Sequence, residues 1–168
     1  MYTDDWKEYS LRALFTISST KTLSLDRLHA GGPGPYPYVT TQATNNGVAG
    51  MYSEYTEEGG VITVDSAVLG TCFYQEKRFS ASDHVEKLVP KVPMSREVAL
   101  FIVTLLNREM YKYSFGRKRS KKILNTESIW LPAKADGNPD WEWMEQFIAR
   151  LMEEERDRVI RIATPGYK

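Results

Sequence analysis

The spacing of apolar residues changes near residue 95, and this change constrains the fold more than any other feature of the sequence. Upstream, apolar and polar residues alternate in short runs such as residues 6–10 and 14–18, which is typical of half-buried β-strands. Downstream, residues 95–111 carry apolar side chains at positions 98, 101, 102, 105 and 106, the spacing of one buried helix face. Many short strands followed by helices predict an α+β fold.

Turn signals divide the first part of the chain into short strands. Asn46-Gly47, Gly59-Gly60 and Gly70 are expected to form turns, because glycine and asparagine tolerate positive φ angles. Strands are predicted at residues 38–41, 48–53, 61–65, 71–75 and 85–89. Residues 22–28 fit either a short helix or a loop. Residues 29–37 (HAGGPGPYP) are expected to form a loop, because glycine and proline are dense there.

The second part of the chain predicts two helices with one strand between them. Ser95 is a suitable N-cap for the first helix, and Pro139 is expected in the first turn of the last one. The strand is predicted at residues 128–132. We therefore expect an α+β fold in which a twisted mixed or antiparallel sheet of short strands is joined by two main helices, at about residues 95–111 and 140–160.

Length and composition favour one soluble, intracellular domain spanning residues 1–168. The hydrophobic fraction is 42% and the aromatic fraction is 12%, which does not indicate disorder. No apolar run approaches the roughly 18 residues that cross a membrane, and the first ten residues lack the pattern of a secretory signal. The single cysteine, Cys72, suits a reducing, cytoplasmic setting.

Charge is balanced over the whole chain but unevenly distributed along it. The chain has 22 basic and 22 acidic residues, so its net charge gives no argument for nucleic-acid binding. Residues 77–122, however, carry 12 basic and 4 acidic side chains, a net of +8, whereas residues 127–157 carry 3 basic and 9 acidic ones, a net of −6. These runs indicate either two solvated faces or two surfaces for partners of opposite charge.

No catalytic or metal-binding pattern emerges from the sequence. His29 and His84 are far apart and lack partners at metal-ligand spacing, and Cys72 lies in an apolar strand that favours a buried, inert thiol. Residues 138–141 (NPDW) begin like motifs of amino-methylating enzymes and nucleases, but the rest of each motif is missing. We therefore expect no cofactor, no metal and no catalysis in this chain.

Residues 112–122 (KYSFGRKRSKK), which we call the basic segment, form the strongest candidate for contact with phosphates. The segment contains no acidic residue, and its side chains suit backbone contacts, with arginine also able to bind guanine edges. Tyr113 and Phe115 are expected mainly to anchor the segment in the core. The alternative is a solvated basic loop. The candidate DNA-binding residues here are Lys112, Tyr113, Arg117, Lys118, Arg119, Lys121 and Lys122.

Residues 36–52 form a second candidate surface, because they carry no charge but many short hydrogen-bonding groups. Such groups bind through hydrogen bonds and not ion pairs, although hairpin turns use the same residue types for their own structure. The candidates in this segment are Thr40, Thr41, Gln42, Asn45 and Asn46.

Several phrases of the sequence resemble the target-recognition domains of restriction-modification specificity subunits, those of type I systems and of related single-chain restriction enzymes. The resemblance runs from about residue 6 to residue 151. It is carried by WKEYSLRALFTISSTK (6–21), YPYVTTQATNNGV (36–48), FYQEKRF (73–79), VEKLVPK (85–91), ALFIVTLLNREMYKYSFGRK (99–118), IWLP (129–132) and NPDWEWMEQFI (138–148).

The resemblance implies sequence-specific binding of double-stranded DNA, with catalysis in a partner methyltransferase subunit and in a further restriction subunit. Complete specificity subunits hold two recognition domains and this chain holds one, so the resemblance implies either a half-subunit that pairs with a second copy or with another such chain, or a single domain of a larger system. Residues at about 140–162 would be the spacer and docking helix. In this reading the hairpin side chains bind base edges, since asparagine and glutamine pair with adenine, and the basic segment binds phosphates. Residues 29–37 and 51–60 are equally suitable as base readers.

Two other functions stay open at this point. The acidic last helix, with Trp141 and Trp143, could dock a protein partner without any DNA binding. A nuclease or methyltransferase fragment is the third hypothesis, and it would require a metal or cofactor site that the sequence does not reveal.

Overall fold

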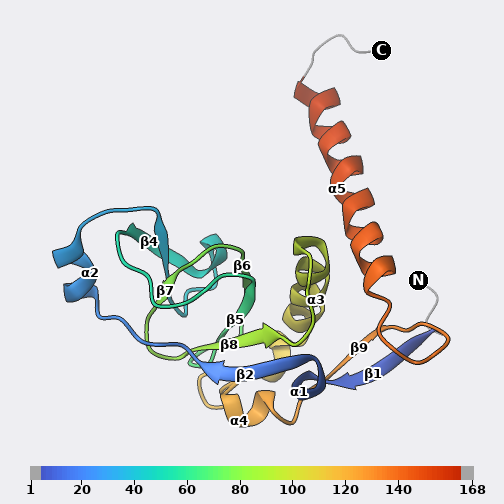
Figure 1. The fold of residues 1–168 in the computed structure, drawn as a ribbon, viewed down its shortest axis with the longest axis horizontal. Helices are drawn as coiled ribbons and strands as arrows, with labels where there is room; N and C mark the ends of the chain where they lie inside the picture. The colour runs from blue at the N-terminus through green and yellow to red at the C-terminus, as the bar shows by residue number, and fades with distance from the viewer. Residues whose placement is uncertain (1–4, 164–168) are drawn as a thin grey trace.

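A computed structural model describes residues 5–163 and confirms the α+β class, with the strands arranged in three small sheets. In Figure 1 a two-stranded ribbon lies at the lower right, a four-stranded sheet lies at the centre, and a separate lobe lies at the left. Helix α5 extends from the body of the molecule toward the top of the view.

The four-stranded sheet is the centre of the fold. Its strands are β2 (Phe15–Ser19), β8 (Val85–Pro90), β5 (Val61–Asp65) and β6 (Cys72–Gln75), antiparallel and in that order across the sheet. Every residue of β5 is buried, because this strand is internal and covered on both faces. Strands β2 and β6 are therefore the two edges of the sheet.

Helix α3 (Arg96–Arg108) packs against this sheet and begins where the sequence predicted. Ser95 caps it by accepting a hydrogen bond from the backbone N–H of Val98. Residues such as Phe101, Ile102 and Leu106 turn toward the main apolar cluster, together with Ile62 and Leu88 of the sheet. The helical spacing thus identified the buried face correctly.

The ribbon pairs the first strand of the chain with the last one. Strand β1 (Trp6–Ser10) runs antiparallel to β9 (Ser128–Pro132), and the short helix α1 (Leu11–Leu14) connects β1 to β2. Helix α5 (Trp141–Ala163) follows β9. Pro139 lies before this helix and not in its first turn, because Asp140 takes the capping position and accepts a hydrogen bond from the N–H of Trp143.

A second, smaller lobe contains helix α2 (Leu25–Gly31) and a three-stranded sheet of β4 (Val48–Tyr52), β3 (Tyr36–Val39) and β7 (Ser80–Ala81). We call it the distal lobe. The expected loop at residues 29–37 is shorter than predicted, since its ends belong to α2 and β3. Ser24 caps α2, and Gly32, with φ of 78°, ends it.

Buried apolar residues form three clusters that share no member. The main cluster joins the central sheet, α3, the ribbon and the start of α5. A second cluster contains Val39, Val61, Phe79, Ala81 and Val85, and a third contains Leu23, Leu28 and Tyr38. The distal lobe therefore rests on small cores that are separate from the one that holds α5.

Helix α5 changes from buried to exposed along its length. Met144 is fully buried and the rings of Trp143 and Phe147 stack at 5.0 Å, next to Phe101 of α3. From residue 149 onward every described residue is exposed. Within residues 5–163, no helix combines the length and apolar character that crossing a membrane requires.

Candidate nucleic-acid interface

The hairpin between β3 and β4 is shaped by residues in the left-handed region of φ and ψ. Asn45, Asn46 and Gly47 have φ of 51°, 54° and 76°, and together they form the short turn η1 (Asn45–Gly47). This explains the Asn-Asn-Gly sequence, because asparagine and glycine are the residues that adopt this backbone most easily.

Most polar side chains of the hairpin are engaged within it. Gln42 Nε2 donates to the carbonyls of Thr44 and Val48, at 3.1 and 2.8 Å, and Thr40 Oγ1 donates to Gly47 O at 3.4 Å. Asn45 Nδ2 also donates to Val48 O, at 2.8 Å.

Asn46 connects the hairpin to the edge strand β6. Its Nδ2 donates to Tyr74 O at 3.1 Å, and Gln75 Nε2 donates to Asn46 O at 3.0 Å. These bonds fix the hairpin tip against the end of β6. The residue types are thus explained by turn structure, and contact of Thr40, Thr41, Gln42, Asn45 and Asn46 with bases stays a prediction.

The basic segment is an irregular excursion between α3 and β9. It contains the end of the 3₁₀ helix η2 (Met110–Lys112), a turn from Ser114 to Arg117 and the first half of the short helix α4 (Lys121–Leu124). The side chains of five of its cations are on the surface: Lys112, Arg117, Lys118, Lys121 and Lys122.

The two aromatic residues of the basic segment do not both anchor it as expected. Tyr113 is half-buried, and its ring lies 4.9 Å from the guanidinium carbon of Arg119. Phe115 is 76% exposed and has Lys118 Nζ 5.5 Å from its ring centre, so it is a surface residue.

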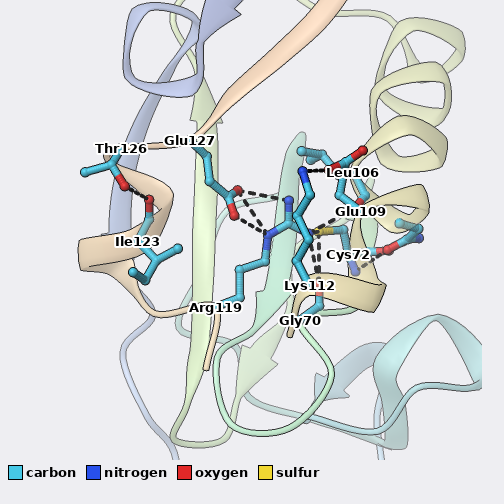
Figure 2. Close-up of polar contacts among 10 residues, drawn as sticks. Gly70, Cys72, Leu106, Glu109, Lys112, Arg119, Ile123, Thr126 and Glu127 are labelled. Atoms are coloured by element: carbon cyan, nitrogen blue, oxygen red, sulfur yellow. Dashed lines mark hydrogen bonds and ion pairs between the residues drawn. The ribbon is translucent and has the colours of Figure 1, made fainter. Parts of the chain in front are cut away.

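Arg119 lies in the interior and leaves the predicted DNA-binding set. Only 2% of the residue is exposed, and Figure 2 shows its guanidinium enclosed by polar partners. Nη2 and Nε bind the carboxylate of Glu127, at 2.9 Å for Nη2, and Nη1 donates to the carbonyls of Gly70 and Leu106, both at 3.1 Å. A side chain with these contacts is inaccessible to a duplex, and its role is to join the basic segment to β6 and α3.

Burial changes the acid–base properties of this cluster. It raises the pKa of Glu127 to about 7, with Lys112 nearby acting in the opposite direction, and it lowers the pKa of Arg119 from its usual value. Desolvation therefore offsets part of the attraction between the two side chains. Burial also raises the pKa of the Cys72 thiol to about 11, so this cysteine is a protonated, inert core residue at neutral pH.

The hairpin and the basic segment do not form one continuous surface. The tip of the hairpin contacts Tyr74 and Gln75 at the end of β6, whereas Arg119 ties the basic segment to Gly70, just before β6 begins, and α4 packs beside β2. In Figure 1, α4 lies at the lower edge of the view, well away from β4 at the upper left. The predicted site residues therefore belong to two separate places on the molecule.

Other sequence candidates have structural explanations. The ring of His29 packs 5.8 Å from that of Tyr52, and His84 is an exposed residue with φ of 60° in the turn before β8. In the part of the chain that the structure describes, no group of three or more His, Cys, Asp or Glu side chains is placed to hold a metal ion.

Comparison with known proteins decides the family. A family model described as the type I restriction modification DNA specificity domain matches residues 3–161. The chain belongs to this family. A curated relative, the specificity subunit S.BcgI of a type II restriction enzyme from Heyndrickxia coagulans, is 29% identical to this specificity domain over 150 residues. That alignment covers 87% of the chain and 43% of the relative.

Solved structures share the fold of this specificity domain. The S subunit of a type I restriction-modification system from M. genitalium superposes with a TM-score of 0.63 and 18% identity, over 94% of this chain and 41% of that one. The HsdS subunit from Thermoanaerobacter tengcongensis gives a TM-score of 0.61 with 11% identity, over 99% of this chain and 42% of that one. The chain thus spans about two fifths of the length of the relatives it matches.

Proposed function

We propose that this chain recognises a specific sequence in double-stranded DNA, as a half specificity subunit that directs a methyltransferase subunit in the cytoplasm. The observation that carries the proposal is the family match over residues 3–161, nearly the whole chain. Catalysis would belong to the modification subunit and to a restriction subunit, and this chain would supply only the choice of site.

Two surfaces would contact the duplex in different ways. The hairpin at the end of β6 would face base edges, since Asn45 and Asn46 are exposed there. The five surface cations of the basic segment would neutralise backbone phosphates, which B-DNA presents along its whole length. Because the hairpin tip lies at the end of β6 and the basic segment lies near its start, phosphate contact would occur away from the bases that are read.

A second copy of the chain would complete the subunit. Met144, Ile148, Met152, Val159 and Ile162 follow one face of α5 at helical spacing. This face is buried at Met144, and it is exposed at Val159 (61%) and Ile162 (76%). Pairing of two such helices would cover the exposed half, and two copies would approach the length of the relatives.

The experiment is selection of bound sequences from random duplexes, followed by salt titration of the selected target. We expect one preferred sequence, and we expect the logarithm of the binding constant to fall linearly with the logarithm of salt concentration. The double substitution Lys121→Ala and Lys122→Ala should make that line less steep, reducing the magnitude of its slope by about two, without changing the selected sequence.

The matched control is Lys121→Arg with Lys122→Arg, which keeps both charges and should keep the slope. If the alanine variant binds with an unchanged slope, the basic segment does not contact DNA. If the native chain selects no sequence, either alone or with a modification subunit, the proposal as a whole is wrong.

Protein interaction without DNA binding is not favoured. Trp141 is half-buried against the main cluster, and Trp143, although 37% exposed, stacks on Phe147 near Phe101, so both tryptophans have packing partners within the fold. The family description names a DNA specificity domain, which gives no support to this alternative.

A further inference from the structure

The loop that follows β6, residues 76–79, lies at the same end of the sheet as the hairpin tip. Gln75, the last residue of β6, donates to Asn46 O at 3.0 Å, and the loop continues directly from it. The loop is held in place at both ends. A Cβ on Gly59 would lie 2.2 Å from Glu76 O, and Phe79, fully buried, exchanges backbone hydrogen bonds with Glu57.

Arg78 is one of three exposed residues in this fixed loop, with Glu76 and Lys77. Its side chain is 51% exposed, and its Nε donates to Glu58 Oε2 at 2.9 Å. The guanidinium carbon lies 4.9 Å from the ring centre of Tyr55, which in turn packs 4.7 Å from the ring of Tyr36. A carboxylate and an aromatic ring therefore favour one orientation of the guanidinium before any partner arrives.

The two terminal nitrogens of Arg78 are left for a ligand. Within residues 5–163 they donate no hydrogen bond, since the one hydrogen bond to Glu58 uses Nε. Two N–H groups in a planar fork match the O6 and N7 acceptors that guanine presents in the major groove. A side chain that is already ordered loses less entropy on binding than a free one.

We propose that Arg78 is a specificity-determining residue that reads one guanine of the DNA target, next to the hairpin. This inference rests on the proposed function and locates its base-reading end at the junction of β6, the hairpin tip and the loop of residues 76–79. Tyr55 and Glu58 act as positioning residues, because they contact Arg78 and fix its orientation.

The test compares Arg78→Lys with Arg78→Ala and the native chain, using target duplexes in which each base pair is replaced in turn. Lysine keeps the charge but lacks the fork. We expect both variants to lose discrimination at the same single G·C pair, by about tenfold to a hundredfold. Arg78→Lys should keep the salt slope of the native chain, and both variants should melt within a few degrees of it.

A control variant separates base reading from charge. Lys77→Ala removes the neighbouring exposed cation and should leave the base preferences unchanged. A uniform loss of affinity for all duplexes in Arg78→Ala, restored by Arg78→Lys, would make Arg78 a phosphate contact and overturn the inference. Unchanged preferences in both variants would also overturn it, while selection by the native chain would keep the proposed function intact.

Tyr55→Leu tests the positioning role. Without the ring the guanidinium loses its support, so discrimination at the same base pair should fall partway toward that of Arg78→Ala. A loss of discrimination at a different base pair would contradict this role for Tyr55.

Discussion

Individual residues in this domain take their roles from tertiary partners that sequence order does not reveal. Arg119 lies between Lys118 and Ser120 in a strongly basic stretch, yet Gly70, Leu106 and Glu127 enclose its side chain. Nothing in the local sequence distinguishes it from the exposed cations beside it. Arg78 is the opposite case, since its orientation depends on Tyr55 and Glu58, some twenty residues away in sequence.

Removal of the buried cation should destabilise the fold. Arg119→Met leaves Glu127 without its partner in the interior and should lower the free energy of unfolding by about 3–5 kcal/mol, measured by urea denaturation. The cost should lie at the lower end of this range, because a carboxyl with a pKa of about 7 can bind a proton when its partner is lost.

Two variants check that expectation. Lys118→Met removes the neighbouring exposed cation and should change stability by less than about 0.5 kcal/mol. Combining Arg119→Met with Glu127→Leu removes both charges and should recover much of the loss. If Arg119→Met is as stable as the native chain but binds DNA less well, the side chain has a binding role after all.

At the scale of elements, the spacing of apolar residues predicted the strands and helices that pack in the core. Strand β5 and helix α3 match their predicted ranges closely, because a long apolar run or a regular apolar face has few alternative structures. Helix α2 was only partly predicted, since its last residues merge into a run of glycine and proline. The four residues of α4 were missed, because charge dominates their sequence.

The exposed half of α5 should mediate self-association. Val159→Glu places a charge on the face that continues from buried Met144, so it should shift the chain toward monomer, measured by analytical ultracentrifugation. The neighbouring Ile160 is similarly exposed (54%) but lies off this face, and Ile160→Glu should leave the association unchanged. Equal behaviour of the two variants would exclude this face as the interface.

At the scale of the molecule, the length of α5 determines how far apart two paired copies would lie. Its 23 residues, at about 1.5 Å each, extend about 35 Å, close to one turn of B-DNA. If two copies pair along this helix about a two-fold axis, the selected target should consist of two symmetric half-sites about one helical turn apart. Sequencing of the selected duplexes checks this directly, and a single asymmetric site would contradict pairing of this kind.

The sequence predicted the fold class and the family at this scale, but not the arrangement of the polar surfaces. Hairpin and basic segment both appear in the sequence as hydrogen-bonding or charged runs. Only tertiary contacts place the hairpin tip at the end of β6 and the basic segment near its start and beside β2. Such an arrangement depends on long-range pairing, which leaves no local pattern.

The three apolar clusters have a consequence for how new binding preferences arise. Substitutions in α2, β3 or β4 disturb only the minor clusters, while the residues that hold α3, the ribbon and α5 belong to another. Because distant sites contribute nearly independently to folding free energy, one region can accumulate changes at little cost to assembly. Under the proposed function, a lineage of such chains would diversify its targets while every member kept the surface that docks the modification subunit.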